Sequence, residues 1–108
     1  MVVRADPKRP DDKIMQLKAE HIKKRELGDI AFIMQSVEGR RFIYRLLEQS
    51  YIFRTTMQGN SWSFFYEGMR NLGLLVYQDI MEVCPDRYIE MCKEAKKIKQ
   101  EDNNYGRN

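Results

Sequence analysis

The chain has 108 residues and a net charge of +3, with 43% hydrophobic and 32% charged residues. This length is that of a single domain. The chain has neither the apolar core of a signal peptide nor an apolar run of about 20 residues, so we expect neither secretion nor membrane insertion. The charges are unevenly distributed: eight Lys/Arg accompany four Asp/Glu in residues 1–25, six accompany nine in 26–92, and five accompany three in 93–108. All lysines lie in the two basic ends.

The N-terminal part divides into an arm and a long helix. Residues 1–10 contain two prolines and few apolar side chains, which predicts a flexible arm. A helix is predicted over 12–35, because the carboxylates of Asp11 and Asp12 suit a helix N-terminus. Its polar first half is expected to project beyond the core, and Gly28 is a candidate break in the helix.

A second helix is predicted over 38–50, after a turn and cap that begins at Ser36. Its apolar residues share one face, and Arg45 is expected to pair with Glu48 three positions later. Residues 51–60 mix apolar, β-branched and polar side chains, and no second strand exists for them to pair with. An ordered loop is therefore predicted there.

The third helix, predicted over 61–83 with Asn60 or Ser61 as its cap, is apolar on more than half of its circumference. We therefore expect it to be central. Its first apolar stripe consists of Trp62, Phe65, Met69, Leu72, Val76, Ile80 and Val83, and a second stripe consists of Phe64, Gly68, Asn71 and Leu75.

A last helix is predicted over 86–100 with Pro85 in its first turn, and residues 101–108 are predicted to fray. The chain is thus predicted to be all-α, a compact bundle of about four helices in one domain over 11–100. A flexible N-terminal arm precedes the domain and a basic C-terminal tail follows it. The predicted main core consists of Trp62, Phe65, Met69, Leu72, Val76, Phe42 and Leu46.

Two glycines lie inside the third helix, where each costs about 1 kcal/mol relative to alanine. A glycine lets another backbone or side chain approach closely. The neighbour at Gly68 and Gly73 is either another part of the domain or a partner chain. The first interpretation predicts that Gly68→Ala destabilises the isolated domain, and the same is expected less strongly at Gly73.

The sequence offers little for catalysis. His21, the single histidine, lies among lysines and is expected to be solvated. Neither a Cys-x-x-Cys nor a His-x-x-x-His spacing occurs, and no glycine-rich loop joins a strand to a helix. We therefore expect no enzymatic activity, no metal and no cofactor.

Arginines alternate with aromatic residues in three places, and the acidic residues Glu38, Glu48 and Glu67 lie nearby. We expect a buried or half-buried polar network that orders the 51–60 loop and presents a polar surface to a neighbouring subunit. Arg54 is expected to bind the loop carbonyls or Glu67. The candidate residues for this network and for interaction are Arg40, Arg41, Arg45, Arg54, Asn60, Glu67, Gly68, Arg70, Asn71 and Gly73.

Binding of nucleic acid is the alternative function. A helix-turn-helix with Gly39 in its turn would place Arg45 and Glu48 at positions that need apolar packing. The acidic middle of the chain also opposes phosphate. The lysines at the two ends could still give a weak, salt-sensitive contact with DNA.

Several motifs resemble a family of small tailed-bacteriophage proteins named after a Bordetella phage protein and encoded among head-assembly genes of short-tailed phages. The similar strings are GRRFIYRLLE, FR, GN, FFYEGMRN followed by GLL, DIME and CP, and Y-EM, which together span residues 39–92, about half of the chain. The most specific pieces are Gly39-Arg40-Arg41-Phe42, Phe53-Arg54, Gly59-Asn60 and Glu67-Gly68-x-Arg70-Asn71-x-Gly73.

The resemblance implies a non-enzymatic structural or assembly protein of a phage particle that acts through protein contacts. It implies portal, head or ejection proteins as partners in a multi-copy assembly. Its expected place is the virion, after synthesis in the host bacterial cytoplasm, at the capsid interior near the portal, at the head–tail junction, or as an internal protein ejected with DNA. The resemblance transfers no catalytic residue.

Overall fold

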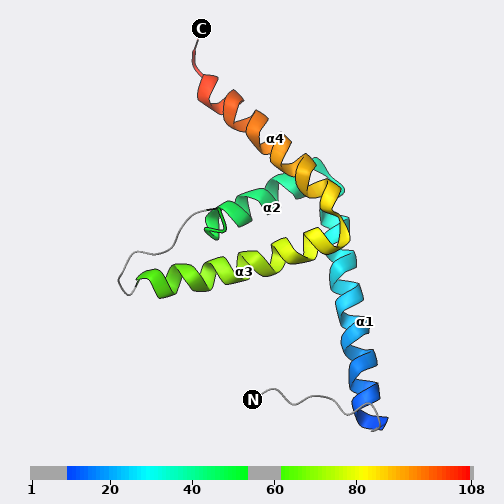
Figure 1. The fold of residues 1–108 in the computed structure, drawn as a ribbon. Helices are drawn as coiled ribbons and strands as arrows, with labels where there is room; N and C mark the ends of the chain where they lie inside the picture. Colours follow the sequence, from blue (N-terminus) through cyan, green and yellow to red (C-terminus); the bar gives the residue numbers. More distant parts are fainter. Residues whose placement is uncertain (1–9, 54–61, 108) are drawn as a thin grey trace.

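The computed structural model describes residues 10–53 and 62–107. These residues form four helices: α1 (Pro10–Ile33), α2 (Val37–Gln49), α3 (Trp62–Val83) and α4 (Pro85–Asn104) (Figure 1). The prediction of an all-α fold with about four helices is confirmed. The predicted arm before Pro10, residues 54–60 of the predicted loop, and both candidate caps of the third helix lie outside the described residues.

Short local signals set the helix ends. The Ser36 side chain accepts a hydrogen bond of 2.9 Å from the backbone N–H of Gly39, so Ser36 caps α2 as expected. Pro85 opens α4, because the first turn of a helix needs no N–H at that position. The candidate break at Gly28 is wrong, since α1 runs through it to Ile33. One glycine costs about 1 kcal/mol, which is too little to interrupt a long helix.

The helices form a thin, elongated body. α3 contacts each of the other three helices, and α2 also packs against α4. The first half of α1 and the second half of α4 extend away from this junction on opposite sides (Figure 1). The chain measures 70 × 39 × 15 Å along its principal axes. Every helix therefore keeps much of its surface in contact with solvent.

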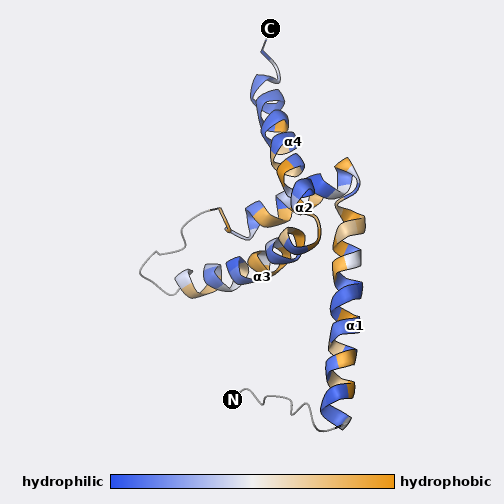
Figure 2. Ribbon diagram, turned by 45° about the vertical axis from the view of Figure 1, so that its right-hand side comes forward, coloured by the Kyte–Doolittle hydropathy of each residue, from blue (hydrophilic) through white to orange (hydrophobic). Residues whose placement is uncertain are grey.

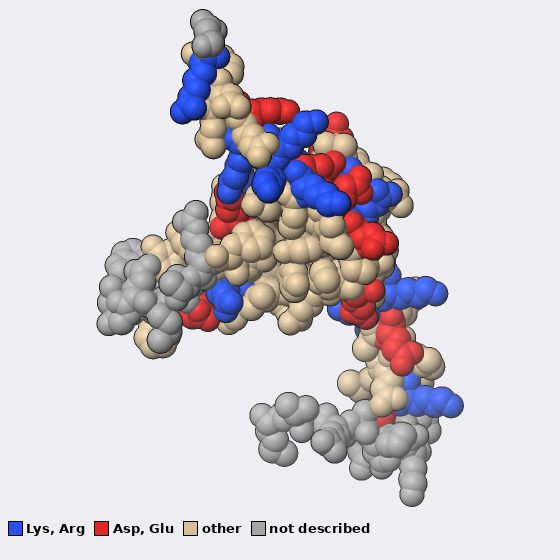
Figure 3. Space-filling view, turned by 45° about the horizontal axis from the view of Figure 1, so that its top comes forward, with Lys and Arg blue, Asp and Glu red and all other residues tan. Residues whose placement is uncertain are grey.

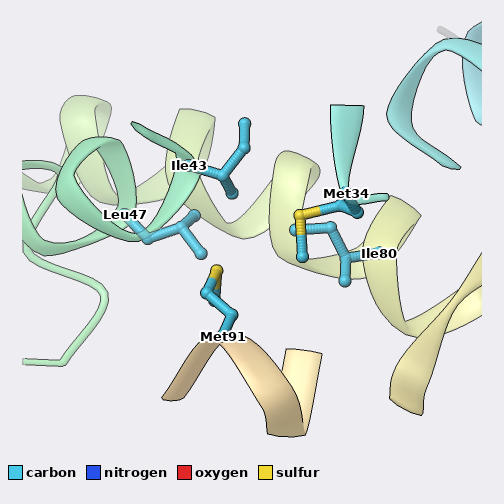
Figure 4. Close-up of a cluster of buried hydrophobic side chains, with 5 residues drawn as sticks. All are labelled: Met34, Ile43, Leu47, Ile80 and Met91. Carbon is cyan, nitrogen blue, oxygen red and sulfur yellow. The ribbon is translucent and has the colours of Figure 1, made fainter. Parts of the chain in front are cut away.

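The core is a small cluster at the junction of the four helices. Its almost completely buried members are Met34, which directly follows α1, Ile43 and Leu47 of α2, Ile80 of α3 and Met91 of α4. Met34 lies against Ile80 on one side of the cluster, and Leu47 faces Met91 on the other (Figure 4). Each helix or its adjoining turn thus contributes at least one side chain, which ties the helices together at one place.

Most of the core predicted from the sequence is wrong. Phe42, Leu46, Phe65 and Leu72 are exposed by 52%, 41%, 57% and 65%, respectively. Met69 and Val76 are half-buried, and the side chain of Trp62 lies outside the description. The physical reason is that α3 is apolar on both sides and α2 carries two adjacent apolar stripes. The periodicity of apolar residues alone therefore does not determine which side of each helix is buried. In the structure, α2 is oriented so that Arg40, Ile43 and Leu47 face inward.

Gly73, not Gly68, is the point of close approach on α3. A Cβ atom on Gly73 would collide with Oγ of Ser50 and lie 2.6 Å from Cγ2 of Ile52. Among the described residues, no atom lies within 4 Å of the corresponding position at Gly68. The expected crowding of Gly68 within the domain is therefore wrong. Five residues correspond to about 140° of helix rotation, so the two glycines lie on different faces.

Gly73→Ala should lower the free energy of unfolding by about 1–3 kcal/mol, because the added methyl group overpacks the contact with Ser50. Helix propensity alone predicts a gain of up to about 1 kcal/mol, so the two effects differ in sign. Gly28→Ala is the matched control, since Gly28 is also helical and a Cβ atom there would meet no described atom within 4 Å. Urea unfolding at equal chain concentration should show opposite shifts for the two variants, and shifts of the same sign would contradict this explanation.

Residues 51–53, directly after α2, are fixed by aromatic contacts. Tyr51 has a φ of 67°, in the left-handed region, and its ring centroid lies 4.7 Å from that of Tyr66 on α3. The ring of Phe53 stacks on Tyr44 at 5.8 Å. The left-handed conformation costs a non-glycine residue about 1–2 kcal/mol, and these ring contacts help to offset it. Two of the first three residues of the predicted loop thus pack against α2 and α3, and the order of the loop stays a prediction.

Candidate functional site

The polar residues predicted from the sequence do not gather at one place. Arg40 is buried between α2 and α4, whereas Arg41 and Arg45 are exposed on α2. On α3, Glu67 and Arg70 are half-buried, Gly68 and Asn71 are exposed and Gly73 is buried, while Arg54 and Asn60 lie outside the described residues. Among the described residues of this set, Arg40 is therefore the one whose polar contacts can be followed, and the wider network stays a prediction.

Arg40 holds α2 against α4. Its Nε and Nη2 atoms donate to the two carboxylate oxygens of Glu94 at 2.7 and 3.0 Å, a bidentate arrangement. Its Nη1 atom donates to the backbone carbonyl of Met34 at 2.9 Å, and Nη2 lies 3.4 Å from Oε1 of Glu90. Arg40 is only 3% exposed, so this guanidinium stabilises the helix junction and does not present itself to a ligand.

The hydrogen bonds from Arg40 lower the pKa of Glu94 below its ordinary value of 4.5, although burial opposes the change. A lowered folded-state pKa means that stability from this pair is complete above the unfolded pKa and is lost as the pH falls through the folded pKa. Urea unfolding between neutral pH and about pH 3 should show a steeper loss of stability for the native chain than for Glu94→Gln. Parallel pH profiles for the two proteins would contradict the assignment.

Arg41 and Arg45 border a groove of about 290 Å³ between α2 and α4. The guanidinium of Arg45 lies 5.4 Å from the ring centroid of Phe42 and covers part of that exposed aromatic ring. The expected pair between Arg45 and Glu48 is wrong, because Glu48 pairs with Lys99 of α4 at 3.2 Å. The charged side chains that line the groove are of both signs: Arg41, Arg45, Lys99, Glu48, Glu94 and Asp102. This mixture favours neither an anionic nor a cationic ligand.

Groups that could carry chemistry are poorly placed for it. Burial raises the pKa of the Cys84 thiol, which leaves it protonated near neutral pH. Burial, with a further contribution from Cys92, raises the pKa of Tyr88 to about 12. His21 is exposed on the projecting half of α1. Over residues 10–53 and 62–107, no three His, Cys, Asp or Glu side chains are grouped to hold a metal ion, and no helix is long and apolar enough to cross a membrane.

The strongest candidate site is the side of α3 that faces solvent. Phe64, Phe65, Leu72 and Leu75 are exposed by 85%, 57%, 65% and 59%. Gly68 lies between them and leaves open space where a side chain would be. We call these five residues the outer α3 face. Single exposed apolar side chains are common, but an apolar cluster on one helix face marks a surface that binds another molecule.

Sequence reasoning found only part of the outer α3 face. It placed Phe65 and Leu72 in the core, and it left partner docking as one of two interpretations for the stripe through Gly68. The signal that could have identified the face is that α3 has more apolar surface than the other helices can cover. α3 is apolar on more than half of its circumference, but the second half of α4 is largely hydrophilic (Figure 2) and the first half of α1 projects away from α3. The described residues therefore leave one side of α3 without apolar cover.

A polar group borders the outer α3 face without interrupting it. Asn71 is exposed beside Gly68 and Leu72. Arg70, in contrast, is half-buried on the opposite side of α3, because six residues after Phe64 correspond to about 240° of helix rotation. The described residues thus present an apolar binding face with a polar residue at its border. No protein-family model, curated protein or solved structure matches the chain, so the residues of this face are the basis for inferring what it binds.

Proposed function

We propose that the chain is a non-enzymatic structural or assembly protein of a bacteriophage particle and that it acts through protein–protein contacts. The observation that carries the proposal is the outer α3 face, whose four large apolar side chains are all more than half exposed. The assignment to a phage particle rests on the sequence motifs of residues 39–92. The portal region of the capsid interior, the head–tail junction and the ejected internal proteins are its candidate places.

The chemistry of the outer α3 face favours a protein partner. Its five residues carry no ionisable side chain and no hydroxyl group. Such a surface gains free energy from burial against another apolar surface, at roughly 25 cal/mol per Å². It offers nothing to hold a phosphate, a metal ion or a polar substrate.

Mass spectrometry of purified particles of the phage that encodes the chain tests the proposal. The chain should co-purify with intact particles and withstand a wash in high salt, because an apolar contact is not screened by ions. Leu75→Ser should reduce its amount in the particles. Ile89→Ser is the matched control, since Ile89 is 53% exposed on α4, away from this face, and should be retained. Absence of the native chain from intact particles would contradict the proposal.

Contact with DNA through the basic ends is the competing function. Two of the lysines in these ends are already paired, Lys23 with Asp79 at 2.7 Å and Lys99 with Glu48 at 3.2 Å. Lys/Arg and Asp/Glu side chains are interspersed on the face shown in Figure 3, which weakens attraction to phosphate. A gel-shift titration at several salt concentrations should show weak binding that disappears at physiological salt. Tight binding at that salt would favour the DNA function.

A further inference from the structure

The chain exposes far more surface than a self-sufficient domain of its size. Its accessible surface is 9031 Å², whereas a globular monomer of 13.0 kDa exposes about 6,300 Å². Its radius of gyration is 18.7 Å, against about 13 Å for a compact chain of this length. The projecting halves of α1 and α4 (Figure 1) and the exposed apolar side chains of α3 belong to this surface.

The outer α3 face has the spacing of a helix-packing seam. Phe65, Gly68, Leu72 and Leu75 follow one another at intervals of three, four and three residues. These intervals correspond to the a and d positions of a heptad, so the four residues form one straight row along the helix. Phe64 flanks the row on one side and is the most exposed of these side chains.

The order of intervals in this row is the same in both directions. When two such helices pack antiparallel about a two-fold axis, each a position meets a d position of the other copy. Gly68 then faces Leu72 of the second copy, and Phe65 faces Leu75. The open space at Gly68 accepts Leu72 of the second copy. The two-fold axis makes this contact between a small and a large residue occur twice in the dimer. A parallel pair would instead place Gly68 opposite Gly68 and leave a void.

We propose that two copies of the chain associate through their outer α3 faces as an antiparallel, two-fold symmetric dimer. This inference rests on the proposed function, since it names the partner of the same face. The row contains no ionisable side chain, so the two identical surfaces bring no like charges together. A full aromatic side chain has about 150–250 Å², so the exposed parts of Phe64, Phe65, Leu72 and Leu75 amount to roughly 500 Å² per copy. Two copies would bury about 1,000 Å² from these side chains alone, the size at which specific interfaces begin.

Light scattering coupled to size-exclusion chromatography tests the dimer. At micromolar concentrations the native chain should have twice the mass of 13.0 kDa. Leu72→Asp should reduce the mass to that of one chain, and Ile89→Asp, on an exposed position of α4, should leave it doubled. A native chain that remains a monomer throughout this range overturns the inference.

The register is tested by exchanging the small and large residues. Gly68→Leu alone should dissociate the dimer, because the leucine meets Leu72 of the second copy. Gly68→Leu combined with Leu72→Ala should restore it, because a large residue again meets a small one. All these positions are exposed, and circular dichroism should report an unchanged helix content in each variant. A dimer that survives Gly68→Leu, or is not restored by the double variant, overturns the antiparallel arrangement.

Failure of the dimer and failure of the proposed function give different results. If the native chain is monomeric but Leu75→Ser is lost from particles, the outer α3 face binds another virion protein, which overturns the dimer and supports the proposed function. If the dimer forms as described but the native chain is absent from particles, the dimer stands and the virion assignment is wrong.

Discussion

Leu47→Ala is expected to lower the free energy of unfolding by about 2–5 kcal/mol. Leu47 is fully buried and faces Met91 of α4 (Figure 4). Its truncation removes apolar burial and leaves a cavity at the place where all four helices meet. A core with so few buried side chains has little capacity to close such a cavity, so the loss should lie within the range for fully buried leucines.

Leu46→Ala is the matched control for Leu47→Ala. Leu46 is the preceding residue of the same helix and is 41% exposed. The two variants have the same effect on helix propensity, so their difference measures burial. Urea unfolding at one chain concentration should give a loss below about 1 kcal/mol for Leu46→Ala. Equal losses for the two leucines would mean that α2 is rotated from the orientation described here.

Arg40→Ala is expected to cost about 3 kcal/mol, at the lower end of the range for breaking a buried ion pair. The variant leaves the carboxylate of Glu94 and the carbonyl of Met34 without the donors that they have in the native chain. The expected loss is at the lower end because the Glu94 side chain is 28% exposed and retains some contact with water. Denaturant melts should show the loss as a lower midpoint.

Two further variants separate charge from geometry at this position. Arg41→Ala removes the adjacent, exposed arginine and should change stability by less than about 0.5 kcal/mol. Arg40→Lys keeps the positive charge but loses the bidentate hydrogen bonds, so its stability should lie between those of the native chain and Arg40→Ala. If Arg40→Lys is as stable as the native chain, the hydrogen-bond geometry contributes nothing.

Helix positions were predictable from the sequence because they depend on local signals. Ser36 and Pro85 mark helix starts by the chemistry of their own side chains. The periodic apolar residues of α3 also identify that helix without reference to the rest of the chain. Such information lies within one or two turns, and a single sequence contains all of it.

The buried side of each helix was less predictable, because it depends on contacts between distant residues. Arg40 looks like a surface residue until Glu94, on another helix, is placed beside it. Burial of Arg40 then orients α2, which leaves Phe42 and Leu46 toward solvent. Likewise, the sequence shows that Gly68 and Gly73 lie on different faces of one helix, but only the position of Ser50 shows which face is crowded. The outer α3 face was missed for the same reason.

The projecting first half of α1 gives the chain an uneven local stability. Residues 11–21 are almost entirely exposed, and α1 is first fixed to α3 where Lys23 meets Asp79 at 2.7 Å. A helix of fewer than about 12–15 residues is only marginally stable on its own. This segment can therefore unwind locally at almost no cost, whereas the junction around Leu47 opens only when the whole chain unfolds. The molecule thus combines a stable helix junction with a projecting segment of α1. This segment can bend, unfold or refold against a neighbouring molecule while the junction stays folded.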